Sequence, residues 1–337
     1  MSTAQETATQ IVVTEPAAKR TLTVPMIGNL LLLAALLIAP IFVKNFVVFQ
    51  FTMILIYAIA ILSLNILTGV SGQVSLGHSA FFAAGAYGAG ILMEHANVPY
   101  PLAILAAGVI CFAIGFLFGL PALRLKGVYL ALATFALAVA APPLLKLGTF
   151  EHWTGGVQGL LVTKPDPAFG LPISQDRWMY YVTLAITLVI YLLSVNLLNS
   201  RSGRAFMAIR DNEIAASSMG INLALYKTLA FGISAGLTGI AGALGAITVA
   251  FVAPDAYTFN FAIALFLGMV IGGVGWLPGS LAGAAFIVYV PNIAEGISKG
   301  LSGAVFGVFI IAVIFLLPNG ARQLAYYLRD QLNKLIK

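Results

Sequence analysis

The chain has 337 residues, of which 61% are hydrophobic and only 8% are charged, and its mean hydropathy is +1.01. This composition excludes a soluble domain and predicts an all-α polytopic membrane protein. The net charge of +6 reflects which loops face the cytoplasm and does not indicate a nucleic-acid partner.

Apolar segments without charges are long enough for about ten transmembrane helices, because one helical span takes roughly 20 residues. The expected spans cover residues 25–43, 46–67, 75–93, 101–120, 127–145, 178–198, 228–252, 258–276, 279–295 and 301–317. Membrane lipid would surround these spans.

The positive-inside rule places both termini in the cytoplasm, because basic residues concentrate on the cytoplasmic side of a membrane protein. With ten spans, the only Lys and Arg residues left outside are Lys44, Lys146, Lys164, Arg177 and Lys299. Residues 1–20 then form a disordered cytoplasmic tail, 21–320 the transmembrane domain and 321–337 a cytoplasmic C-terminal tail.

Glycines and polar residues interrupt the apolar pattern at 65–79, NILTGVSGQVSLGHS, where Gly69, Gly72 and Gly77 are expected to break a span. Broken helices at membrane depth are a recurrent way to build a solute path. The candidates to line or support such a path are Asn65, Gln73, Ser75 and His78. The alternative is that these side chains only pack and form hydrogen bonds between helices. For His78 a structural hydrogen bond is favoured over proton relay, since no carboxylate is near it in the sequence.

Residues 201–227 form a charged segment between two long apolar runs, so we expect a polar helical loop at the cytoplasmic membrane surface. Asp211 and Glu213 suit the N-terminus of a short helix, where carboxylates meet exposed N–H groups. Gly220 is placed to end that helix in the left-handed conformation, and Asn222 to cap the next one.

Small side chains at Ala215 and Ala216 would let this short helix approach a partner closely. The helix is therefore interpreted as a docking element. The alternative is an ordinary solvated loop between two spans.

A second glycine-rich interruption, GMVIGGVGWLPGS at 268–280, breaks a later apolar run. The fold expected from the sequence thus contains two broken-helix regions, one in each half, as in transporters built from repeats.

The sequence also lacks several signatures. It contains no G-x-x-x-x-G-K-[ST] run for binding nucleotide and no metal-ligand spacing of Cys and His. We therefore expect no cofactor and no enzymatic site. Ion-coupled carriers usually need a buried carboxylate, and the expected spans show none, so a partner would supply the energy for uphill transport. The single cysteine, Cys111, is expected to be a packed thiol.

Five motifs follow one another along the chain: LNILTG with GQVSLGH at 64–78, LRLKGVY at 123–129, TGG with GL at 154–160, GRA, AIR, EIAA and GI within 203–221, and GGVG with PG at 272–279. In this order they resemble the LivM-type permease subunits of branched-chain amino-acid ATP-binding-cassette importers. The resemblance covers nearly the whole chain beyond the N-terminal tail.

The resemblance implies a location in the bacterial inner membrane and a set of partners. These are a homologous LivH-type permease, two cytoplasmic ATPase subunits that bind the ATP, and a periplasmic solute-binding protein. The helix at 211–220 would be the coupling helix on an ATPase, with contacts from Arg210, Glu213, Ala215, Ala216 and Gly220. The outer loop at 146–177 would dock the binding protein through Glu151, Thr154, Gly155, Gly156 and Asp166.

The resemblance leaves the solute open, because near relatives carry urea, short amides or aromatic acids. Local sequence alone also leaves a second class of function open. That class is an autonomous channel or an ion-coupled secondary carrier.

Overall fold

The computed structural model of the chain describes residues 36–125, 127–170 and 172–297, and beyond them only 307–309, 311–312, 315 and 320–323. The expected tail at 1–20, and most of the spans at 25–43 and 301–317 and of the tail at 321–337, lie outside the described residues. The chain divides into two units, Met1–Val43 and Lys44–Lys337. Residues 36–42 of the first unit are helical.

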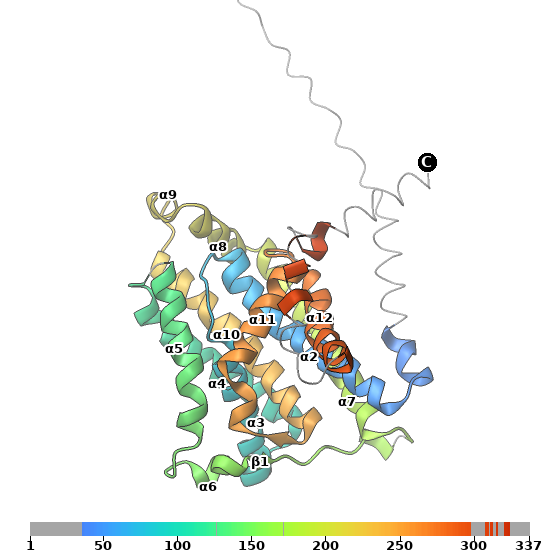
Figure 1. The fold of residues 1–337 in the computed structure, drawn as a ribbon. Helices are drawn as coiled ribbons and strands as arrows, with labels where there is room; N and C mark the ends of the chain where they lie inside the picture. Colours follow the sequence, from blue (N-terminus) through green and yellow to red (C-terminus); the bar gives the residue numbers. More distant parts are fainter. Residues whose placement is uncertain are drawn as a thin grey trace, which may run out of the picture. The chain divides into compact units, whose positions relative to one another are not determined.

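The second unit is a helical bundle (Figure 1). Among its described residues, five helical segments are long and apolar enough to cross a membrane: α2 (Asn45–Leu64) with its continuation η1 (Asn65–Val70), α4 (Tyr100–Ala122), α5 (Val128–Leu145), α7 (Gln175–Asn199) and α10 (Leu223–Val249). Three further helices belong to the bundle, α3 (His78–Ala96), α11 (Phe259–Gly272) and α12 (Gly279–Ile297). These eight segments correspond to the eight spans expected between residues 46 and 295. The polytopic helical class is thus confirmed, while the number of ten spans stays a prediction.

Helix α10 forms the centre of the bundle, and small residues bring it into backbone contact with α3 and α4. A Cβ atom on Gly85 of α3 would overlap the carbonyl oxygen of Gly239, and one on Gly242 would overlap that of Phe82. On the other side, a Cβ atom on Gly115 of α4 would overlap the side chain of Ala235. Such close approach is how membrane helices gain van der Waals contact without a hydrophobic driving force between them.

Short elements cover the two opposite ends of the bundle (Figure 1). One end carries α8 (Arg201–Asp211) and α9 (Glu213–Ser218). The other carries α6 (Glu151–Thr154), η2 (Gly156–Gln158) and a two-stranded antiparallel ribbon of β1 (Leu160–Leu161) and β2 (Phe251–Val252). Two further short turns are η3 (Ala168–Gly170) and η4 (Pro254–Tyr257). The segment expected to be the cytoplasmic loop and the segment expected to be the outer loop therefore lie at opposite ends of the bundle.

Candidate functional site

The first helix break is shorter than the sequence predicts. The interruption expected at Gly69 is wrong, because η1 continues α2 as a π-helix through Val70. The π-helical pattern keeps backbone groups paired at this depth: the Ser71 N–H donates to the carbonyl of Ile66 at 3.0 Å. The non-helical segment covers 71–77 and contains Gly72, whose φ is +74°.

The second break lies between α11 and α12, as the sequence predicts. Helix α11 ends at Gly272, and Gly273 and Gly275 follow with φ of +108° and +77°. Helix α12 begins at Gly279. These left-handed conformations are open to glycine and costly for other residues.

Asn65 joins η1, the helical segment before the first break, to the second break. Its Nδ2 donates to the carbonyls of Gly273 and Trp276, both at 3.2 Å, and its Oδ1 accepts from the N–H of Gly275 at 2.7 Å. The side chain is buried. One amide therefore satisfies three backbone groups of a segment more than 200 residues away.

Ser75 and His78 belong to a buried hydrogen-bond network with α10. The Ser234 hydroxyl donates to the Ser63 carbonyl at 2.7 Å, so it accepts from His78 Nε2–H, also at 2.7 Å. Nδ1 of the neutral ring then accepts from the Ser75 hydroxyl at 3.2 Å, which in turn accepts from the Gly77 N–H. The expected structural hydrogen bond of His78 is confirmed, and the network assigns its tautomer.

Polar contacts also connect the 201–227 segment to the first break. Arg210 Nη1 donates to the carbonyl of Gly69 at 3.2 Å. Gln73 Nε2 donates to the carbonyl of Lys227 at 3.4 Å, and Lys227 Nζ pairs with Glu213 at 2.6 Å. Lys227 lies inside α10 and is buried, although the sequence places it in the loop. Helices α8 and α10 thus contact the break, and α9 is connected to it through the pair of Glu213 with Lys227.

Helix α9 is shorter than the expected helix at 211–220. Asp211 ends α8 and does not begin α9, because the extended residue Asn212 separates the two helices and caps α9. The Asn212 side chain accepts from the first N–H groups of α9 at 3.0 Å. The predicted left-handed stop at Gly220, φ +82°, and the predicted cap at Asn222 are both confirmed.

The exposed face of α9 differs from the small-residue face expected from the sequence. Ala215 is exposed, but Ala216 is only 4% exposed and packs within its own chain. Ile214 and Met219 are instead 77% and 86% exposed. Sequence reasoning missed these two residues, although large apolar side chains in a charged loop are a usable signal for a partner-binding surface.

In the loop expected on the outer side, Thr154, Gly155 and Gly156 build a turn. The Thr154 hydroxyl lies 2.9 Å from the Leu145 carbonyl and accepts from the Gly156 N–H, and both glycines have positive φ. Thr154 is buried, so its side chain supports the loop from inside.

Glu151 and Asp166 are the exposed members of the expected docking set. Asp166 accepts a hydrogen bond from Gln175 Nε2 at 2.7 Å. Both carboxylates therefore place negative charge at the end of the bundle opposite α9.

The described residues contain no group of three His, Cys, Asp or Glu side chains positioned for a metal ion. Cys111 is buried in α4, where its thiol lies 3.5 Å from the Phe81 carbonyl, so the predicted packed thiol is confirmed.

Comparison with known proteins identifies the family. A family described as the permease component of branched-chain amino acid transport systems matches residues 46–316. The high-affinity branched-chain amino acid transport system permease protein LivM of Salmonella typhimurium is 32% identical over 326 residues, covering 88% of this chain and 76% of the relative. LivM of Escherichia coli is 34% identical over 273 residues, 73% of this chain and 64% of the relative.

The autoinducer 2 import system permease protein LsrC of Salmonella typhimurium is 27% identical over 210 residues, 60% of this chain and 57% of the relative. No solved structure matches the chain significantly. The match over most of the chain shows that it belongs to the family of permease components of branched-chain amino-acid transport systems.

Proposed function

We propose that this chain is the permease subunit of an ATP-binding-cassette importer for branched-chain amino acids in the bacterial inner membrane. It crosses the membrane ten times, with both termini in the cytoplasm. Its partners are a homologous LivH-type permease, two ATPase subunits that bind the ATP, and a periplasmic solute-binding protein. The names of the LivM relatives support this assignment.

The observation that carries the proposal is the polar connection from the cytoplasmic helices to both breaks. One arm runs from Arg210 to the Gly69 carbonyl, and a second runs from Glu213 through Lys227 to Gln73. A displacement of α8 and α9 by an ATPase would therefore act on η1 through Arg210 and on the first break through Lys227 and Gln73.

The strength of these two polar connections suits a role in coupling. Hydrogen bonds to charged groups contribute about 1.5–3 kcal/mol each. Coupling free energies between two sites are typically about 1–3 kcal/mol. Losing one of these connections in only one of two conformations of the permease is thus enough to shift the equilibrium between the conformations. Asn65 extends the effect to the second break.

Asn65, Gln73, Ser75 and His78 support the wall of the solute path in this proposal. Their polar groups bond within the chain, so they hold the non-helical backbone in place while other groups face the solute.

On the cytoplasmic side, Ile214, Ala215 and Met219 provide the exposed surface of the coupling helix, while Ala216 and Gly220 set its packing and its end. On the outer side, Glu151 and Asp166 face the binding protein.

The proposal is tested in proteoliposomes that contain this chain, the homologous permease and the two ATPase subunits, with the binding protein added outside. ATP-driven uptake of leucine, and not of urea, acetamide or aromatic acids, is expected. Leucine flux through this chain alone, without ATPase subunits, would instead indicate a channel or secondary carrier.

Charge reversal at Glu151 and Asp166 tests the outer contact. It should weaken stimulation of ATP hydrolysis by the binding protein, and the loss should be larger at low salt, because screening at 0.15 M ionic strength already acts over about 8 Å. Unchanged stimulation at every ionic strength would contradict docking through these acids.

A further inference from the structure

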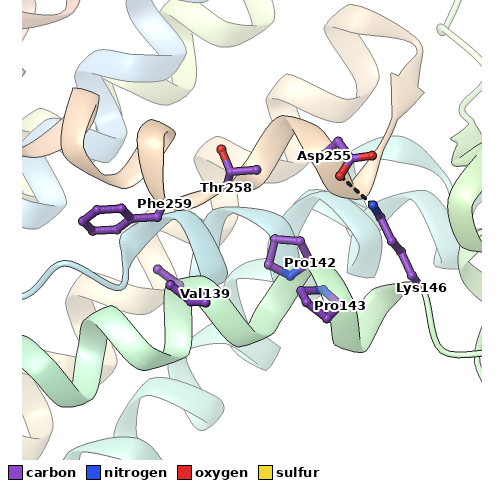
Figure 2. A pocket seen from close by; sticks show the side chains of 8 residues that line it. Val139, Pro142, Pro143, Lys146, Asp255, Thr258 and Phe259 are labelled. Atoms are coloured by element: carbon purple, nitrogen blue, oxygen red, sulfur yellow. Dashed lines mark hydrogen bonds and ion pairs between the residues drawn. The ribbon is translucent and has the colours of Figure 1, made fainter.

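A pocket of about 400 Å³ lies between the C-terminal half of α5 and the η4–α11 segment (Figure 2). Its lining residues are Ala138, Val139, Pro142, Pro143, Lys146, Asp255, Thr258 and Phe259. The volume falls in the lower part of the range of about 300–1,000 Å³ found for small-molecule sites. Lys146 follows the end of α5 that leads to α6, so the proposed topology puts the pocket on the outer side.

The charged groups of the pocket lie together at one end of it. Lys146 Nζ and Asp255 Oδ1 are 2.6 Å apart, and Figure 2 shows them beyond Pro142 and Pro143, with Phe259 toward the opposite end. Their side chains are 29% and 68% exposed. An ion pair this exposed stabilises a protein by about 0–1 kcal/mol, so separating it for a ligand costs little.

The two prolines change the hydrogen bonding of α5 beside the pocket. Pro142 and Pro143 have no N–H, so the carbonyls of Ala138 and Val139 lack the donor that an α-helix normally supplies four residues later. Thr258 adds a hydroxyl that makes no cap bond to α11, although it holds the N-cap position.

The rest of the lining is apolar and rigid. Phe259 packs edge-on against Phe135 of α5, with ring centroids 4.5 Å apart. Val139, Pro142 and Pro143 complete a surface without side-chain donors or acceptors. A polar side chain placed there would lose its water without gaining a hydrogen bond.

We propose that this pocket receives a zwitterionic aliphatic α-amino acid on its way into the permease. Its carboxylate pairs with Lys146, its ammonium group pairs with Asp255, and its side chain lies on the surface of Val139, Pro142 and Phe259. This site rests on the proposed function and deepens it, because it explains selection of the solute by the permease itself.

Charge balance gives the selectivity. A zwitterion replaces one ion pair by two and leaves no charge without a partner. A ligand with one charge would leave Lys146 or Asp255 unpaired, and a neutral amide such as urea would pair with neither.

The pocket is tested with the purified full chain carrying Val139→Cys, a position that is 48% exposed. The native Cys111 is buried and sets the background. Leucine and isoleucine should slow maleimide labelling. Isocaproate and isoamylamine each keep one charge of leucine, and should need at least about tenfold higher concentrations, the equivalent of one charge-assisted hydrogen bond.

Lys146→Met and Asp255→Asn should each weaken protection by leucine by about tenfold or more for the same reason. Lys164→Met is the matched control, because it removes an ion pair of the same kind, Lys164 with Asp176, away from the pocket. It should leave protection unchanged. Equal unfolding midpoints of the three variants show that the loss is not one of folding.

Three results would overturn the pocket and spare the proposed function. The first is leucine uptake by the complete importer with no amino acid slowing the labelling. The second is protection by isocaproate equal to that by leucine, which indicates a lipid-like occupant. The third is permanent block of labelling by the partner permease alone. Protection by leucine in a chain whose complete importer carries no branched-chain amino acid would support the pocket and reject the proposed solute.

Discussion

Replacing Asn65 by leucine removes the side chain that joins η1 to the second helix break. The change deletes three hydrogen bonds, of 3.2, 3.2 and 2.7 Å, and leaves the N–H of Gly275 and two carbonyls without this partner. Such bonds contribute about 1 kcal/mol each in water-soluble proteins and about 0.6 kcal/mol between membrane helices. The expected loss in free energy of unfolding is therefore about 2–3 kcal/mol.

The assay is unfolding of the purified chain in mixed micelles by increasing SDS, with ATP-driven uptake measured in parallel. Thr52→Val is the matched control, because Thr52 is also buried in α2 but its hydroxyl bonds only the Val48 carbonyl of the same helix. It should cost about 1 kcal/mol or less.

Asn65→Leu should also raise ATP hydrolysis relative to uptake, because a movement of η1 is no longer transmitted to the second break. An Asn65→Leu protein as stable as Thr52→Val, with full coupled uptake, would refute the joining role.

Four further substitutions have expected outcomes. Gly69→Ala should destabilise the chain by about 1–3 kcal/mol, because the new Cβ overlaps the Asn65 side chain and lies 2.6 Å from the Gly275 nitrogen. Gly88→Ala meets no atom within 4 Å and should be neutral or stabilising in the same SDS titration. Met219→Ser should reduce co-purification with the ATPase while shifting stability by less than about 0.5 kcal/mol, whereas undiminished co-purification would count against α9 as the docking element. Ser234→Ala leaves the His78 Nε2–H without its acceptor and should cost about 1–3 kcal/mol; an unchanged unfolding midpoint would show that the network contributes nothing.

Local features of the fold were predictable from the sequence because their causes are local. Gly220 takes a positive φ and Asn222 caps α10, as their residue types indicate. The assignment of Asp211 to the start of α9 failed because α8 continues through Asp211, and the extended residue Asn212 caps α9 instead.

Contacts between distant segments were not predictable in this way. Helix periodicity shows which face of a soluble helix is buried, but these helices are apolar on all sides, so the sequence does not reveal that Asn65 faces Gly275. The π-helix at η1 was not predicted for a related reason: Gly69 is compatible both with a helix break and with a wider helix.

The backbone contacts of α10 constrain how the molecule can move. Packed helices shear past one another when the side chains between them change rotamers. Gly85, Gly239 and Gly242 leave no side chains to do so where α3 meets α10. We therefore expect α3 and α10 to move as a single body, with rotation at the two non-helical segments, where Gly72 and Gly273 occupy conformations that are costly for other residues. We expect alternating access in the proposed importer to be a hinged motion about these two glycine-containing segments, while α10 keeps its contacts with α3.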